Sequence, residues 1–172
     1  MALIPYAEQS DWPPKVRERA AELPIGNLIG MLANAPALVG PTLRLGGAIL
    51  SESKLDPVLR ELAILRTAAL TDSEYEWVQH AAIARRLEIE DEKVKALESD
   101  SVREGPFDGR ESLVLEIVEE AVGGTPRPEL VQQAERELGR TETVELILTV
   151  GYYSMLGCLM RATEIDLDDP LT

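Results

Sequence analysis

Residues 57–70 read PVLRELAILRTAAL, and this helical segment decides which class of fold the sequence predicts. It follows Asp56, and Asp at the N-cap with Pro at the first helical position is a strong signal for a helix start. The segment is apolar on most of its faces, which is typical of a helix at the centre of a bundle. We therefore predict an all-α fold organised around a central helix at 57–70.

Helix signals continue on both sides of this segment, whereas strand patterns are essentially absent. Ser73 and Glu76 match the capping-box pattern and predict a helix at 74–87. Pro36 and Pro41 predict a broken region of short helical pieces. Six further helices are expected, at residues 15–23, 43–51, 91–97, 110–122, 126–138 (with Thr125 as its cap) and 143–161.

The length of 172 residues fits one domain. We expect a helical arm at 1–42, a core motif at 43–100 and C-terminal helices at 110–161. The nearly all-apolar last helix favours a large buried interface or packing on two sides, and it carries Tyr152 and Tyr153, whose hydroxyls are expected at a cleft. The acidic tail that follows, up to Pro170, is expected to be frayed.

Charge and hydropathy exclude several classes of function. The chain has 17 Lys and Arg against 31 Asp and Glu, a net charge of −14, so it repels nucleic acid and anionic membrane surfaces. The apolar stretch at 146–160 is shorter than the ~20 residues of a membrane span. Neither a signal peptide nor a Gly-rich phosphate loop is recognisable. We expect a cytoplasmic protein with no nucleic-acid or membrane partner.

The sequence contains a single cysteine, Cys158. One thiol excludes an internal disulfide and a two-cysteine redox relay. Cys158 lies within the apolar run 155–160, so we expect it to be buried as a small hydrophobic side chain.

The sequence also contains a single histidine, His80, which lies between two apolar stripes of the predicted helix 74–87. It is expected to point toward the core or a cleft. Spacing alone leaves two alternatives equally open, because the ring could be a core group bonded to Glu76 or a catalytic group. Glu61 is a carboxylate within the apolar central helix, and it is either favoured there by the helix dipole or part of a site.

Two further charged residues are ambiguous in the same way. Arg66 lies among apolar neighbours, so it needs an anionic partner, either a glutamate of the core or a substrate carboxylate. We favour the internal ion pair. Glu76 could cap the amide of Ser73 or hydrogen-bond His80, but one carboxylate cannot do both well.

Taken together, RELAILR at 60–66 and EYEWVQH at 74–80 resemble the carboxymuconolactone decarboxylase family, which includes the AhpD-type alkyl hydroperoxidases. The resemblance covers about residues 30 to 100, and it implies a helical bundle that assembles into trimers or hexamers. In the peroxidase branch a glutamate precedes a Cys-x-x-Cys pair and a histidine. Glu61 and His80 match the outer positions, whereas Ser73 and Glu76 replace the cysteines. Without the two thiols, the thiol peroxidase cycle cannot run.

The decarboxylase branch keeps a Glu-x-x-x-His arrangement, which Glu76 and His80 match. This resemblance implies a lyase without metal or organic cofactor, or an isomerase, that acts on a small carboxylated lactone or related unsaturated acid. His80 would protonate the enolate-like carbon that remains after loss of carbon dioxide, and Glu61 or Glu76 would orient its ring.

Substrate contacts are expected from Arg66, Tyr75 and Trp77. The role of Arg66 as a cation for the substrate carboxylate is inferred from its charge and is not part of the family motif. A metal site formed by His80 and the two glutamates is not favoured, because nothing else in the spacing indicates one. The alternative function is a non-catalytic oligomer of the same fold that binds a small molecule or acts as a scaffold.

Overall fold

The computed structural model describes residues 1–20, 25–99 and 102–168. Within these ranges the chain contains nine α-helices, one short 3-10 helix (η1) and no strand, which confirms the all-α fold. The elements are η1 Gln9–Asp11, α1 Pro14–Ala20, α2 Gly26–Ala33, α3 Pro36–Ser51, α4 Pro57–Leu70, α5 Glu74–Arg86, α6 Asp91–Ala96, α7 Gly109–Gly123, α8 Pro128–Leu138 and α9 Arg140–Thr163.

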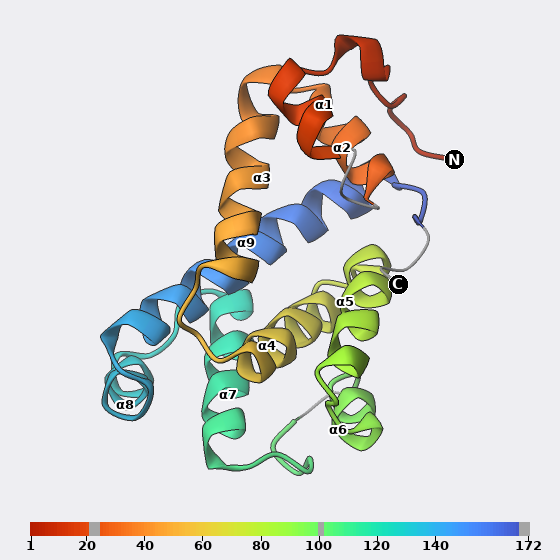
Figure 1. Ribbon diagram of the computed structural model, residues 1–172. Helices are drawn as coiled ribbons and strands as arrows, with labels where there is room; N and C mark the ends of the chain where they lie inside the picture. Colours follow the sequence, from red (N-terminus) through yellow and green to blue (C-terminus); the bar gives the residue numbers. More distant parts are fainter. Residues whose placement is uncertain (21–24, 100–101, 169–172) are drawn as a thin grey trace.

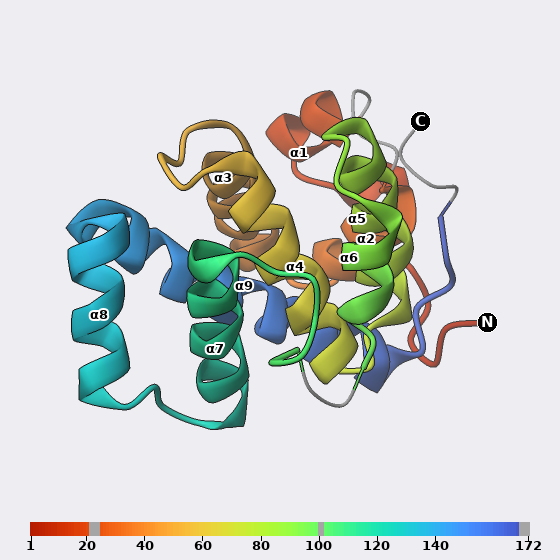
Figure 2. The same cartoon turned by 90° about the horizontal axis from the view of Figure 1, so that it is seen from below.

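Helix α4 forms the centre of the bundle, as the sequence predicts. It packs against α5, α7 and α9, and its ten consecutive residues from Leu59 to Ala68 are all buried. Figure 1 shows α9 running across the whole molecule, from α8 at one end to the N-terminal helices α1 and α2 at the other. Seen from below, α8, α7, α4 and α5 follow one another across the bundle (Figure 2).

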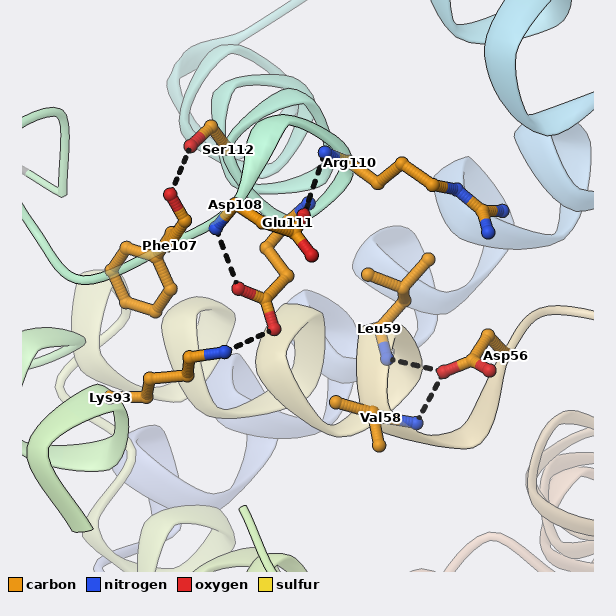
Figure 3. Close-up of polar contacts among 9 residues, drawn as sticks. All are labelled: Asp56, Val58, Leu59, Lys93, Phe107, Asp108, Arg110, Glu111 and Ser112. Carbon is orange, nitrogen blue, oxygen red and sulfur yellow. Dashed lines mark hydrogen bonds and ion pairs between the residues drawn. The ribbon is translucent and has the colours of Figure 1, made fainter. Parts of the chain in front are cut away.

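Side-chain caps define where two of the core helices begin (Figure 3). The Asp56 carboxylate accepts hydrogen bonds from the amides of Val58 and Leu59 at the start of α4. At the start of α7, Asp108 and Glu111 form a capping box, and Lys93 from α6 donates to Glu111 at 2.8 Å. These caps satisfy amides that no helical carbonyl can reach.

The capping box predicted at the start of α5 is not formed. The Ser73 side chain makes no capping hydrogen bond, and the Glu76 carboxyl is buried instead of reaching back to the Ser73 amide. The reason is tertiary, because α9 packs over this turn. A Cβ at Gly157 would lie only 3.3 Å from Glu76 Oε2.

Other boundaries differ from the sequence-based expectations. Helix α3 begins at Pro36, where a proline is favoured, and continues through Pro41 in its second turn, although that proline removes one internal hydrogen bond. Helix α8 begins at Pro128 with Arg127 as its N-cap, two residues later than predicted, and Thr125 does not cap it. The predicted end of the first helix at Leu23 lies outside the described residues.

The tail was predicted to be frayed, which is wrong as far as Asp168. The Asp168 carboxylate accepts hydrogen bonds from the Asn27 amide and, at 2.5 Å, from the Tyr75 hydroxyl. Asp166 is likewise bonded to the Tyr6 hydroxyl. The tail is therefore hydrogen-bonded to both α2 and α5, which the composition of the tail alone does not indicate. Pro170 lies outside the described residues.

Helix α9 also corrects two expectations. Cys158 is exposed and not buried, because the apolar run extends around both faces of the helix and Cys158 falls on the outer one. On that outer face Val144, Leu148 and Met155 are each about half exposed. At 24 residues, α9 is long and apolar enough to cross a membrane. Half of its apolar window is buried within the protein, however, and a core helix of a soluble protein passes the same test.

Candidate functional site

A cavity of about 150 Å³ lies where the N-terminal helices meet α5 and α9. Its walls are mostly aliphatic and aromatic, and the charged or polar exceptions come from α5. The lining residues are Ile25, Leu28, Leu43, Gly46, Gly47, Leu50, Tyr75, Glu76, Gln79, His80, Ile83, Tyr152, Tyr153, Leu156 and Met160. Its volume matches a ligand about the size of benzene, since engineered apolar cavities of this size bind that molecule.

Two buried side chains from adjacent helices form an acid–base pair at the cavity wall. His80 Nδ1 lies 2.7 Å from Glu61 Oε2, and Glu61 is completely buried while His80 is 6% exposed. A carboxylate at this distance holds the proton on Nδ1. Nε2 makes no hydrogen bond among the described residues, so it is the nitrogen left for a ligand in the cavity that the ring lines.

The surroundings of this pair restrict its orientation. The Tyr153 ring packs edge-on against the imidazole, with centroids 4.9 Å apart and an interplanar angle of 90°. Arg60 Nε lies 3.7 Å from the second oxygen of Glu61. The buried carboxylate therefore has a cation on each side when His80 is protonated, which compensates the cost of its burial.

Glu76 lies on the same helix one turn before His80 and also lines the cavity. It is 2% exposed, and neither carboxyl oxygen has a hydrogen-bond partner among the described residues. Burial raises its pKa from 4.5 to about 8, and the neighbouring Ser73 side chain opposes part of this shift. Near neutral pH, Glu76 is therefore mainly an uncharged carboxylic acid.

The structure shows which of the two glutamates bonds His80. Glu61, and not Glu76, bonds the imidazole, although Glu76 is the closer residue in sequence. Both glutamates and His80 converge at one place, as expected for a site. Tyr75 also lines the cavity, and its hydroxyl is bonded to Asp168.

Arg66 and Trp77 do not belong to this cavity, which corrects their predicted substrate contacts. The Arg66 guanidinium donates to Glu119 Oε1 at 2.6 Å and to the carbonyls of Leu97 and Ser99. This confirms the internal ion pair. Trp77 packs on the cluster between α4, α5 and α7 and borders a separate surface hollow. Both residues lie on parts of their helices that face away from the cavity lining.

Sequence reasoning missed the wall that the N-terminal arm supplies. Leucines of α2 and α3 close the cavity, but in sequence they resemble any other core positions. Gly46 of α3 is required by close packing, because a Cβ there would lie 2.3 Å from the Tyr152 hydroxyl oxygen. Tyr152 and Tyr153 both line the cavity, in agreement with the prediction for the last helix.

Candidate metal ligands and the thiol were located among the described residues. Among residues 1–20, 25–99 and 102–168, no group of three His, Cys, Asp or Glu side chains is placed to hold a metal ion. The sole cysteine, Cys158, lies on the exposed face of α9 and is not among the cavity residues.

The helical bundle has an AhpD-like fold. The fold is similar to the AhpD core of an uncharacterized peroxidase-related protein from Ralstonia eutropha JMP134, with a TM-score of 0.83 and 18% identity over 98% of this chain and 93% of that one. The fold is also similar to a peroxidase-related protein from Silicibacter sp. TM1040, with a TM-score of 0.78 and 16% identity over 96% of this chain and 91% of that one. For a protein of unknown function from Agrobacterium tumefaciens the TM-score is 0.71, with 14% identity over 82% of this chain and 96% of that one.

These likenesses establish the fold, whereas the family follows from the sequence of the core region. Residues 36–105, from α3 through α6, match the model of the carboxymuconolactone decarboxylase family. This match confirms the resemblance of the two motifs at 60–66 and 74–80 to that family. No curated protein matches the chain.

Proposed function

We propose that the protein is a cofactor-free lyase or isomerase that acts on a small carboxylated lactone or a related unsaturated acid. One observation carries the proposal. The only histidine of the chain lines a mostly apolar cavity, and a fully buried glutamate lies 2.7 Å from its Nδ1. A histidine oriented in this way can move a proton at Nε2, as in acid–base enzymes generally.

The reaction follows from this arrangement. Loss of carbon dioxide from the substrate leaves the bonding electron pair on carbon as an enolate-like anion. His80, as an imidazolium, donates its Nε2 proton to that carbon, and water then restores the proton on the ring. Glu61 stays ionised and stabilises the imidazolium through the short ion pair. In an isomerase the same nitrogen would remove a proton from one carbon and return it to another.

The walls of the cavity support this chemistry. A carboxylate loses its hydration when it enters an apolar site, whereas the transition state for carbon dioxide loss spreads the charge and needs less solvation. Leu28, Leu43 and Leu156 provide such surroundings. The volume of about 150 Å³ limits the substrate to roughly a single ring with small substituents.

The proposal does not use thiol chemistry, although two of the similar structures are of peroxidase-related proteins. A thiol peroxidase cycle through a Cys-x-x-Cys pair needs two cysteines, and this sequence has one. Ser73 and Glu76 occupy the positions that match the pair. Relatedness to those proteins therefore concerns the fold.

The test is release of carbon dioxide from a panel of small lactone and β-keto carboxylic acids by the wild type, His80→Ala and Glu74→Gln. Glu74 is an exposed residue of the same helix and serves as the matched control. We expect His80→Ala to lose about 10²- to 10⁴-fold in rate, with its fold intact by circular dichroism, and Glu74→Gln to keep the rate. Equal release by wild type and His80→Ala would contradict the role of His80.

A second candidate is a non-catalytic protein that binds a small molecule in the same cavity. The observation in its favour is that no Lys or Arg is among the cavity-lining residues, so a charged substrate finds no fixed cation there. Ligand-dependent changes in the His80 ring signals without turnover of any acid in the panel would favour this candidate.

We also propose that the protein works as a homo-oligomer, a trimer or hexamer. The half-exposed Val144, Leu148 and Met155 on α9 support this proposal, because apolar side chains grouped on one helix face often mark a protein interface. Light scattering coupled to size-exclusion chromatography tests it, and a monomer at micromolar concentration would contradict it.

A further inference from the structure

Glu76 is the least satisfied buried polar group at the site. Buried carboxyl groups almost always have hydrogen-bond partners, yet both oxygens of Glu76 lack one among the described residues. Glu76 is one of the lining residues and is 2% exposed, and both of its carboxyl oxygens are shielded from bulk water. Leaving a buried donor or acceptor unpaired is unfavourable, and a bound ligand that pairs with it recovers this cost.

We propose that Glu76 is a ligand-binding residue that donates a hydrogen bond from its uncharged carboxyl group to the carbonyl oxygen of a small carbonyl compound. The proposal rests on the proposed function, since it assigns the ligand class and a second catalytic group to the same cavity. The ligand class is a lactone, ketone or enone about the size of one six-membered ring.

The charges around the cavity favour this class over others. No Lys or Arg is among the lining residues, and His80 when protonated already pairs with Glu61, so phosphates and multiply charged acids find no set of cations there. A carbonyl oxygen needs a donor and no counter-charge. An acid whose pKa burial has raised to about 8 still carries its proton at neutral pH and can supply that donor.

Because Glu76 lies close to His80, its hydrogen bond to the ligand carbonyl can assist the proton transfer by His80. Residues four apart on a helix lie on one face, with Cβ atoms about 5–6 Å apart. A carbonyl oxygen bonded to Glu76 therefore places a neighbouring carbon near Nε2 of His80. When that carbon loses carbon dioxide or a proton, negative charge develops on the oxygen, and a neutral carboxyl in an apolar site stabilises it.

Other titratable groups surround Glu76, so a pH effect must be separated from theirs. The buried ones on the helices that pack around this region are Tyr75 and His80 on α5, Arg60 and Glu61 on α4, and Tyr152 and Tyr153 on α9. The variant Glu76→Gln keeps a hydrogen-bond donor at the same place and cannot titrate. Any pH dependence that remains in this variant belongs to the other groups.

The experiment uses 2-cyclohexenone labelled with ¹³C at the carbonyl, observed by NMR on the full-length protein. In the wild type at pH 6 we expect a downfield shift of the bound carbonyl, and at least about tenfold weaker binding at pH 9.5, where Glu76 is ionised. Glu76→Gln keeps a smaller shift without that pH dependence. Glu76→Leu loses the shift. Glu74→Gln behaves as the wild type.

Three results would overturn the proposal. They are the same carbonyl shift in Glu76→Leu as in the wild type, equal wild-type binding at pH 6 and pH 9.5, and no bound probe in the wild type at millimolar concentration. Circular dichroism confirms that each variant is folded. If Glu76 controls the probe but carbon dioxide release does not depend on His80, the lyase proposal fails and the binding role of Glu76 stands. If carbon dioxide release depends on His80 but Glu76 does not control the probe, only the proposed role of Glu76 is rejected.

Discussion

Two of the buried charged residues on helix α4, Glu61 and Arg66, have different surroundings. The Arg66 guanidinium donates to a carboxylate and two backbone carbonyls, so its hydrogen bonds are made within the protein. Glu61 bonds a histidine that lines a cavity, and the other nitrogen of that ring has no partner among the described residues. A buried charge therefore indicates function only when its network ends at a space that a ligand can occupy.

The largest expected effect concerns the structural side of this comparison. Arg66→Ala leaves Glu119 and the carbonyls of Leu97 and Ser99 without their donor, so we expect a loss of about 3–5 kcal/mol in the free energy of unfolding. Urea unfolding measures it. The exposed Arg110, 3.6 Å from Glu142, is the matched control, and Arg110→Ala is expected to cost at most about 1 kcal/mol. Equal losses of stability for both variants would show that the buried Arg66 contributes no more than an exposed arginine.

The next effect concerns Glu76 and the pH dependence of stability. Its pKa is raised from 4.5 to about 8, so the folded protein holds a proton that the unfolded chain releases above pH 4.5. Stability from this group is therefore present at low pH and is lost as pH rises toward 8. Between pH 5 and 7.5 we expect the wild type to lose about 3 kcal/mol relative to Glu76→Gln. Parallel stability curves for the two proteins would show that Glu76 has an ordinary pKa.

Glu61→Gln tests the functional side of the comparison. The amide oxygen can still accept from Nδ1, but it cannot stabilise an imidazolium as a carboxylate does. We expect the rate of the His80-dependent reaction to fall about 10²-fold, while the free energy of unfolding changes by less than about 2 kcal/mol. Rate measurements and urea unfolding on one preparation compare the two. A large stability loss with an unchanged rate would assign Glu61 the same structural role as Arg66.

The smallest effect is expected at the rim of the cavity. Asp168→Ala removes the acceptor for the Asn27 amide at the start of α2 and for the Tyr75 hydroxyl. We expect a loss of about 1 kcal/mol, typical of a helix cap, and faster amide hydrogen exchange in α2. If exchange in α2 is unchanged, the tail does not hold this helix in place.

The central part of the fold could be predicted because local signals and burial agree there. Asp56-Pro57 marks the start of α4, and its all-round apolar character correctly predicts a central position. The N-terminal region was predicted less well, since Pro36 and Pro41 suggested a break where α3 is continuous. Proline effects depend on the distance from the helix start, which spacing alone does not reveal.

The candidate site shows the same division. The scarcity of histidine and the anomalous carboxylate drew attention to His80 and Glu61, and the structure brings them together. Arg66 shows the limit, because the sequence favoured an internal ion pair and also listed a substrate contact, but it did not identify the partner, Glu119, which lies 53 residues further along the chain. A sequence does not state which long-range partner satisfies a buried cation.

By itself, the sequence determined the all-helical class, the central position of α4, the family and the residue types available for acid–base chemistry. Periodicity, caps and composition are local, and they act before the chain is packed. Only the tertiary structure decided that Glu61 and not Glu76 orients His80, that Glu76 remains unpaired in the cavity, and that the N-terminal arm closes it. Those outcomes depend on which helix faces approach one another, because burial and pairing set the charge state of each group.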